Sequence, residues 1–483
     1  MEKIRNNSGE CNTLKLVRSF LVLVIVFFCT YMFAQNNTIL TLEAFYVKIK
    51  ANHPLTLQAA LQNTMADAEL MKAKGRFDPT FAGSLNQKNF ENKEYFSLLN
   101  TELKIPTWPG IDIKTGYELN RGVFLGPENS TPNNGLLFAG VALNLGQGLF
   151  IDERRAGVSS AEIMQRFASA KQRDLINELL FNATLVYWDW FRAYNVLEVY
   201  KTSLRNAQER FNAVRFNVSS GDRPQIDTVE AKIQIQIIQI GLNQAQLDFT
   251  NASTLLSGYF WNEENKNTGL DIFQKPAIAE DELRQSSNNF DVSSPFDFVA
   301  DHPYLEQIRQ KTKQLNIDRN LKKDRLKPMV SLQYNPVTEA IGSNILTNYN
   351  INNYTWGVEF KMPLFLRKER GDLKIAELKI RENELFLNNK SQELLNKYQV
   401  YINEWRATND QIGIFEETVK LYEQMFIAER RLFEIGESSL FLVNTREQAY
   451  INAKIKLTEF ITKNRVSYYS IYYFAGKLGD KED

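Results

Sequence analysis

The sequence has little of the residue types that build disulfide frameworks, metal sites and catalytic triads. It contains two cysteines and two histidines among 483 residues. Cys11 and Cys29 both lie near the N-terminus, so we expect no disulfide and no cysteine-based metal site in the rest of the chain. His53 and His302 are far apart in sequence, and neither belongs to a His-x-x-x-His pair. We therefore predict no catalytic site, no metal site and no cofactor.

The chain also lacks an excess of positive charge. Residues 1–35 combine four basic side chains, an apolar run over residues 20–28 and Ala34 before the expected cut, as in a secretory signal peptide. An uncleaved membrane anchor is the alternative. Removal of this segment takes away four of 57 basic and two of 57 acidic residues, which leaves a net charge of −2. This balance argues against a nucleic-acid partner. The bulky residues before Cys29 argue against lipid attachment there.

Glycine and proline are absent from residues 158–220, which predicts one uninterrupted helix about 95 Å long. Within it, Tyr187, Trp190 and Tyr194 begin a row of apolar residues at steps of three and four that continues to Val214. Such a row is typical of a coiled-coil seam. A second run follows residue 364 and is interrupted by Gly371 and Gly413 before Gly436. These helices alone would also suit a soluble coiled-coil rod.

The sequence pattern repeats at an offset of 249 residues. Ala51, His53 and Pro54 match Ala300, His302 and Pro303. Asn52 is a plausible N-cap with Pro54 in the first helical turn. We interpret the histidines as parts of duplicated helix starts.

Each copy then contains strands in which apolar and polar residues alternate, so that one face of the sheet is apolar. We predict that this face contacts lipid, although a soluble sheet with one core face would alternate in the same way. The predicted lipid-facing residues are Phe81, Leu85, Val141, Leu143, Val330, Leu332, Tyr334, Trp356, Val358 and Phe360. Further strand-like pieces at residues 99–105 and 111–119 leave the strand count between residues 80 and 145 open.

Each long helix ends at a polar turn, around Gly221 and Gly436, and a shorter helix returns. The expected organisation is a signal peptide (1–35), a first repeat (36–262), a linker (263–294), a second repeat (295–479) and a C-terminal tail (480–483). The fold class is mostly α with a transmembrane β-barrel portion and very long coiled-coil helices. Four strands cannot close a barrel, so other copies of the chain must close it. The strand loops would face outside the cell, and the helices would extend about 100 Å into the periplasm.

The paired Ala-x-His-Pro starts, Gly-Arg-Phe-Asp-Pro at residues 75–79 and Ile-Asp-x-x-Glu-Ala at residues 226–231 resemble the TolC family of outer-membrane efflux channels. The likeness covers the mature chain, including its duplication. It implies a homotrimer with a twelve-stranded barrel in outer-membrane lipid and a twelve-helix periplasmic α-barrel. It also implies no chemistry by the channel itself, with a periplasmic adaptor and an inner-membrane pump or secretion ATPase as partners.

The resemblance points to the helical tips as the adaptor-contact sites. The positions carried over are Gly221, Asp222, Gly436, Glu437, Ser438 and Ser439. Turn chemistry alone would also explain these residues.

The acidic constriction common in the family is in doubt, because residues 440–443 are apolar and Asn444 stands where a carboxylate is common. Asp227, Glu230 and Glu447 are possible substitutes, although such charges usually mark a solvated helix face. Trp108 could belong either to an interfacial aromatic girdle or to an ordinary turn.

The function expected from these features is an outer-membrane channel of a tripartite efflux or type I secretion system. The alternative is a periplasmic coiled-coil scaffold or adaptor protein whose strands form a soluble domain. The exported substrate is not readable from the sequence.

Overall fold

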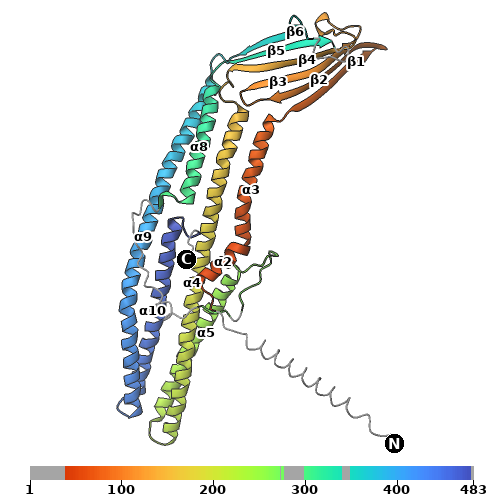
Figure 1. The fold of residues 1–483 in the computed structure, drawn as a ribbon. Coiled ribbons are helices and arrows are strands. Elements are labelled where there is room, and N and C mark those ends of the chain that lie inside the picture. Colours follow the sequence, from red (N-terminus) through yellow and green to blue (C-terminus); the bar gives the residue numbers. More distant parts are fainter. Residues whose placement is uncertain (1–38, 272–273, 277–298, 340–348, 480–483) are drawn as a thin grey trace, which may run out of the picture.

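The computed structural model describes residues 39–271, 274–276, 299–339 and 349–479. The expected signal peptide, much of the expected linker and the tail at 480–483 lie outside the described residues. The molecule is long and narrow, with a β-sheet at one end and a stalk of helices that extends away from it (Figure 1). Its sequence thus separates into a sheet end and a helical end, as the order of elements predicted.

Two very long helices run through the stalk. They are α4 (Glu153–Ser219, 67 residues) and α9 (Arg367–Glu434, 68 residues), each about 100 Å long. The first contains the glycine-free and proline-free run up to Ser219, with Ser220 as its C-cap, and the second passes through Gly371 and Gly413 without a break. The prediction of long helices is confirmed.

The shorter helices pack along the two long ones. α5 (Gln225–Ser257) returns along α4, and α10 (Leu440–Phe474) returns along α9. In the half of the stalk nearer the sheet, α3 (Pro54–Lys74) and α8 (Pro303–Asp324) take the corresponding places. A short helix, α2 (Leu42–Asn52), precedes α3. No helix in the described residues is both long and apolar enough to cross a membrane.

The apolar row predicted for α4 contributes to the core of the stalk, and so does an apolar row on α9. On α4 the side chains of Tyr187, Trp190 and Leu197 are almost completely buried. On α9, Val419 and Phe426 are buried as well. The buried aromatic rings contact one another across helices, so the apolar rows of both repeats form the core that holds the stalk together.

The N-cap at the start of α3 differs from the prediction by one residue. The N-cap of α3 is His53 and not Asn52, because the imidazole Nδ1 accepts a hydrogen bond from the backbone N–H of Leu55 at 3.2 Å. His302 caps α8 in the same way, with 3.1 Å to the N–H of Tyr304. In both copies a proline occupies the first helical position. Each histidine therefore serves as a helix cap.

The sheet contains six antiparallel strands in sequence order. The first repeat supplies four of them and the second repeat two, so the extra pieces at residues 99–105 and 111–119 belong to full strands. The described chain therefore has six strands, whereas each chain of a trimeric twelve-stranded barrel would supply four. The strands are β1 (Thr80–Phe90), β2 (Lys93–Pro106), β3 (Ile111–Arg121), β4 (Leu136–Gly146), β5 (Met329–Glu339) and β6 (Tyr354–Lys361).

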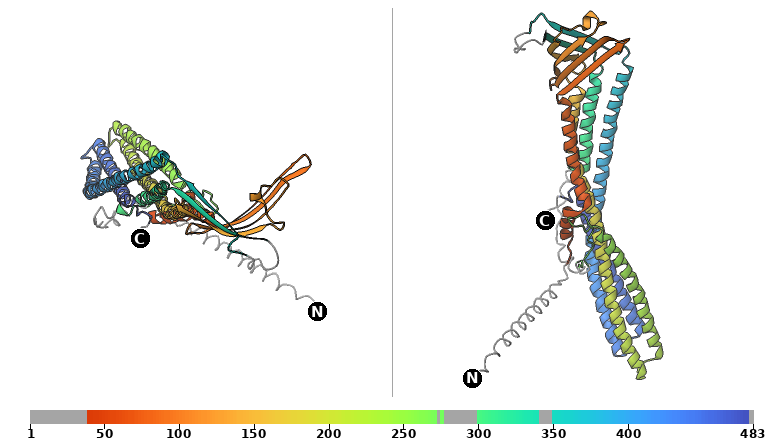
Figure 2. Two further views of the ribbon diagram at one scale, coloured as in Figure 1. Left: turned by 90° about the horizontal axis from the view of Figure 1, so that it is seen from above. Right: turned by 90° about the vertical axis from the view of Figure 1, so that its right-hand side faces the viewer.

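The helices all connect to one end of the sheet. The connections β1–β2 and β3–β4 lie at the far end, where β5 also ends and β6 begins, as expected for loops that share one side. Only the β2–β3 turn, where Gly110 has φ +84°, returns on the helix side. Seen along the stalk, the sheet extends sideways beyond the helices (Figure 2).

Candidate functional site: sheet face, junction and helical tips

One face of the sheet is apolar across all six strands. Residues directly opposite each other in an antiparallel pair share a face, and Phe360, Val330 and Leu145 lie opposite one another in register. The same row continues through Leu143 to Ile111 on β3. All ten predicted lipid-facing residues lie on this apolar face.

The opposite face is polar and partly charged. Glu102 and Lys114 form an ion pair across β2 and β3 at 3.6 Å. Gln333 and Glu359 continue the polar face on β5 and β6. The sheet therefore separates an apolar from a polar surface, as its sequence pattern predicts.

The apolar face has no cover among the described residues. Phe81, Trp356 and Phe360 are each more than 60% exposed, and the helices lie beyond the edge of the sheet rather than over it. A contiguous apolar surface of this kind marks contact with another protein or with lipid. This uncovered face is the strongest functional feature of the chain.

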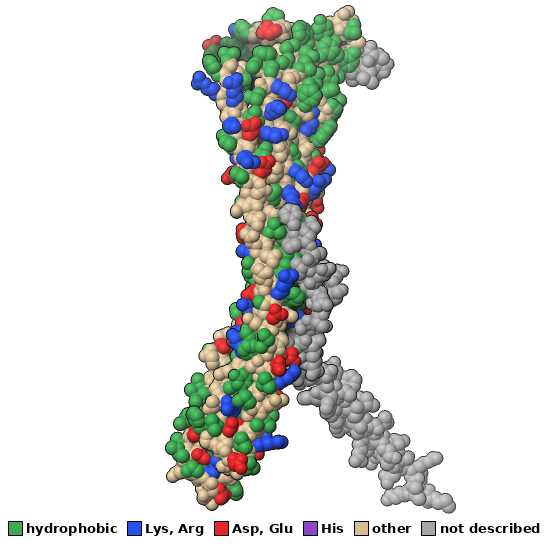
Figure 3. Space-filling model, turned by 90° about the vertical axis from the view of Figure 1, so that its left-hand side faces the viewer, with side chains coloured by type: hydrophobic (Ala, Val, Ile, Leu, Met, Phe, Trp, Pro, Cys, Tyr) green, Lys and Arg blue, Asp and Glu red, His purple; other side chains and the backbone are tan. Residues whose placement is uncertain are grey.

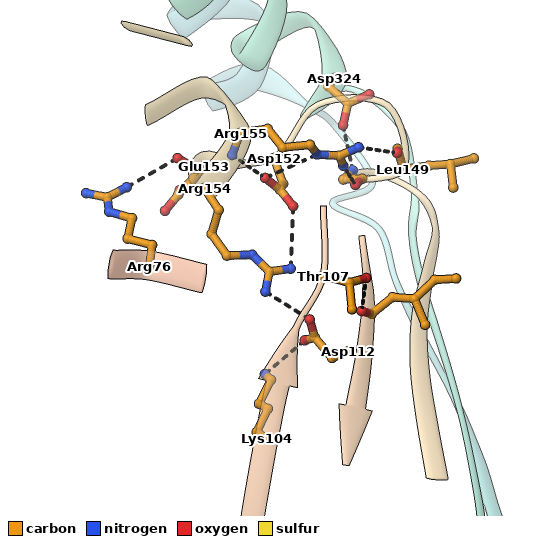
Figure 4. Close-up of polar contacts among 12 residues, drawn as sticks. Arg76, Lys104, Thr107, Asp112, Leu149, Asp152, Glu153, Arg154, Arg155 and Asp324 are labelled. Atoms are coloured by element: carbon orange, nitrogen blue, oxygen red, sulfur yellow. Dashed lines mark hydrogen bonds and ion pairs between the residues drawn. The ribbon is translucent and has the colours of Figure 1, made fainter. Parts of the chain in front are cut away.

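A network of charges joins the sheet to α4 (Figure 4). Nη1 of Arg154 lies 2.9 Å from Oδ1 of Asp112 on β3. Nη2 of the same arginine lies 3.5 Å from Oδ2 of Asp152. Asp112 also pairs with Lys104 on β2 at 3.0 Å. Asp152 caps α4 by accepting a hydrogen bond from the N–H of Arg155 at 2.8 Å. The first turn of the helix is thus tied to two strands.

Trp108 lies in the β2–β3 turn, on the helix side of the sheet. Its ring centroid is 5.3 Å from that of Phe77, which follows α3. The indole is still more than half exposed. Trp108 therefore makes a turn contact and also presents an aromatic surface at the level where sheet and helices meet.

The two tips of the stalk have the same backbone design. Gly221 and Gly436 have φ values of +84° and +85°. In each turn the glycine N–H bonds to the carbonyl three residues earlier, and the next N–H bonds to the carbonyl five residues earlier. This is the Schellman arrangement, in which a left-handed residue ends a helix. Turn chemistry thus accounts for both glycines.

The predicted tip residues differ in exposure. Asp222, Glu437 and Ser439 are exposed, whereas Ser438 is half-buried and donates a hydrogen bond to Glu429. Apolar side chains that the prediction of contact sites did not include are exposed beside them. They are Phe216, Ile226, Ile435 and Phe441. Their position beside the two turns is the sequence signal that could have identified them as candidate contact residues.

Charged side chains tie the two helical hairpins together just behind the tips. Arg210 on α4 pairs with Glu447 on α10. The Glu447 side chain is buried, and that of Arg210 is 9% exposed. Arg223 donates to the carbonyl of Phe433 and its guanidinium lies 3.7 Å from the centroid of the Phe433 ring. The interpretation of Glu447 as part of a solvated face is therefore wrong, because α4 covers it.

The other two acidic candidates also have partners. Asp227 pairs with Arg223 at 3.6 Å, and Glu230 accepts a hydrogen bond from Asn444 at 3.3 Å. A cavity of about 670 Å³ lies beside these contacts, lined in part by Arg210, Arg223 and Phe433. Among the described residues, no group of three or more His, Cys, Asp or Glu side chains could hold a metal ion.

Solved structures of known proteins share this arrangement of a sheet and long helices. The outer membrane channel CmeC of Campylobacter jejuni superimposes with a TM-score of 0.64 at 14% identity, over 90% of this chain and 86% of that one. VceC of Vibrio cholerae gives 0.62 at 15%, over 90% and 96%. MtrE of Neisseria gonorrhoeae, in its open state, gives 0.63 at 12%, over 90% and 88%. The fold is that of outer membrane channels.

A family model described as outer membrane efflux protein matches residues 297–463. The second repeat therefore carries an outer membrane efflux protein domain, and the resemblance to TolC-family channels is confirmed. No curated protein matches the chain. The domain and the channel fold together support a channel role in a tripartite efflux system.

Proposed function

We propose that this chain forms a homotrimeric channel in the cell outer membrane. In this assembly, the sheets of three chains close into one β-barrel and the stalks form a tunnel in the periplasm. The observation that carries the proposal is the apolar sheet face, which spans six strands and is uncovered in the described chain. Lipid would cover this face, and the polar face would line the pore.

The edges of the sheet support closure by further copies. In the described chain β1 pairs only with β2, and β6 pairs only with β5. Unpaired strand edges at membrane depth are costly, and a closed barrel removes them. Three copies of six strands would give an eighteen-stranded barrel, wider than the twelve-stranded one that the resemblance implies.

The stalk supports lateral assembly as well. On α5, exposed apolar residues follow each other at steps of three and four, which is the spacing of a helix seam. They are Ile226, Val229, Ile233, Ile237 and Ile240. On α9, Ile414, Leu421, Met425 and Leu432 are exposed in a similar row. Neighbouring copies would bury these rows in a twelve-helix tunnel.

The tips would contact a periplasmic adaptor, which links the channel to an inner-membrane pump. Gly221, Asp222, Gly436, Glu437, Ser438 and Ser439 are the proposed contact positions. The exposed apolar side chains Phe216 and Ile435 beside them support a protein-binding surface. The channel itself would be a passive conduit without a cofactor, driven by the pump.

A periplasmic scaffold or adaptor remains the second candidate from the sequence. Such a protein would be water-soluble, and its sheet would then expose Trp356, Phe360 and Phe81 to water. Residence in the outer membrane after a high-salt wash would contradict this candidate.

The test of the proposed function is the mass and conductance of the detergent-extracted protein in a planar bilayer. We expect a complex of three chain masses and discrete channel steps. A variant with lysine in place of Val358, on the apolar face, should lose channel activity, whereas the matched Gln333→Lys on the polar face should keep it. A monomer without conductance would overturn the proposal.

A further inference from the structure

The two places where a strand passes into a long helix share a Leu-Phe pair but differ in charge. Leu149 and Phe150 precede α4, and Leu364 and Phe365 precede α9, at the same offset of 215 residues. Phe150, Leu364 and Phe365 are each more than 70% exposed. The repeat therefore keeps a Leu-Phe pair at the base of the sheet. Both residues are exposed in the second junction, whereas Leu149 of the first is half-buried.

The charges that follow the two pairs are opposite at matched positions. Asp152 and Glu153 in the first junction correspond to Arg367 and Lys368 in the second. In the first junction Arg154 is occupied by Asp112 and Asp152. The charges of the first junction are thus paired within the described chain.

The second junction, residues 361–370, has four basic residues and one acidic residue. Arg367 and Arg370 form no ion pair with any of the described residues, and both are exposed. The guanidinium of Arg367 lies 5.3 Å from the centroid of the Phe365 ring. Lys and Arg side chains gather directly below the sheet on the face that includes α9 (Figure 3). Lys368 pairs with Asp372 at 3.4 Å. The junction thus presents an aromatic ring beside two arginines that have no ion pair among the described residues.

The apolar face of the sheet ends at this level. Phe360 belongs to that face, and Met362, Leu364 and Phe365 continue the exposed apolar surface towards the basic residues. Rings and cations in this order match the boundary of a bilayer, where aromatic residues lie at headgroup depth and basic residues reach the phosphates.

We propose that residues 361–370 bind the headgroups of anionic phospholipids in the periplasmic leaflet, with Phe365 inserted at headgroup depth and Arg367 and Arg370 bound to phosphate. The inference rests on the proposed function, because it requires the sheet to lie in the outer membrane. It adds a lipid preference that the first junction, with its charges paired, does not share.

Native mass spectrometry of the detergent-extracted full chain, titrated with phosphatidylglycerol or with phosphatidylethanolamine, tests the inference. We expect phosphatidylglycerol to bind more tightly, and the double variant Arg367→Gln/Arg370→Gln to weaken its binding by about thirtyfold. The matched control is Arg406→Gln/Arg431→Gln, which removes two exposed charges from the same helix further down the stalk. It should change binding less than twofold.

The variants are first checked for channel steps in phosphatidylethanolamine bilayers. If they conduct but bind both lipids alike, and the double variant equals the control, the inference is overturned while the proposed function stands. If the unmodified chain neither assembles nor conducts, the proposed function fails and the inference fails with it. Phe365→Ser provides a second variant, expected to weaken binding of both lipids.

Discussion

The stalk and the sheet differ in how far their large apolar side chains are buried. In the stalk, rows of large side chains such as Trp190, Tyr187 and Phe191 are buried by helices of the same chain. In the sheet, Trp356 and Phe360 are as apolar but stay exposed. The stalk thus has an apolar core built by one chain, although the rows on α5 and α9 stay exposed, whereas the apolar face of the sheet has no cover among the described residues.

The largest difference is expected between two tryptophans. Trp190→Ala removes a fully buried ring whose indole N–H donates to Ser253 at 3.1 Å, and should cost about 3–5 kcal/mol of stalk stability. Trp356→Ala removes an exposed ring and should cost less than about 1 kcal/mol. Thermal unfolding followed by circular dichroism compares them. Equal losses would contradict the division between stalk and sheet.

A comparable loss is expected at the buried charge pair behind the tips. Arg210→Met leaves the carboxylate of Glu447 buried without its partner, which should cost roughly 3–5 kcal/mol. The double variant Arg210→Met/Glu447→Leu should recover most of this stability, because no uncompensated charge remains. Unfolding of the single and double variants measures the recovery. A double variant as unstable as the single one would show that the pair does not act through its charge.

The next effect concerns the two faces of the sheet. Val358→Lys places a charge on the apolar face and should disfavour membrane insertion by about 2–4 kcal/mol if that position lies near the middle of the bilayer. Gln333→Lys places the same charge on the polar face and should be tolerated. The fraction of protein recovered in washed outer membranes gives the comparison. Equal recovery of both variants would refute the lipid-facing assignment.

The helix cap at His302 predicts a pH dependence of the stalk. Burial lowers the pKa of its imidazole to about 4, while the carbonyl of Tyr473 acts in the opposite direction. The unfolded chain takes up this proton near pH 6.5, so stability should fall as the pH drops from about 6.5 to 4. The loss is on the order of 3 kcal/mol at the lower limit.

His302→Asn keeps an acceptor at the cap but does not titrate. Its unfolding temperature should therefore change less than that of the unmodified chain over the same pH range. Parallel curves for the two proteins would remove His302 as the cause.

The smallest effects compare two glycines of α9 and its tip. Gly436→Ala forces a Cβ into a left-handed backbone conformation and should cost about 1–2 kcal/mol. Gly413→Ala lies inside the helix with open space around its Cβ position and should stabilise by about 0.5–1 kcal/mol. Unfolding of the stalk helices measures the change in stability for both variants. The same sign for both changes would contradict the assigned turn geometry.

Local signals in the chain were sufficient for much of the fold. The absence of glycine and proline from residues 158–220 predicts α4, because the hydrogen bonds of a helix join residues four apart and no breaker interrupts the run. Alternation in β5 and β6 predicts their apolar face for a similar reason, since the period of a strand is set by its own backbone. The turns at Gly221 and Gly436 follow from the same local chemistry.

Other features depend on contacts between distant residues, and no local pattern could reveal them. The strand count required the register of β2 against β1 and β3, and His53 replaced Asn52 as a cap because of side-chain geometry. Whether Glu447 met water depended on α4, which brings Arg210 to it from 237 positions away. Local sequence patterns specify where the helices run and where the strands alternate. Which charges are buried and which apolar faces stay open follows from the three-dimensional packing, because burial depends on what the rest of the chain places beside each residue.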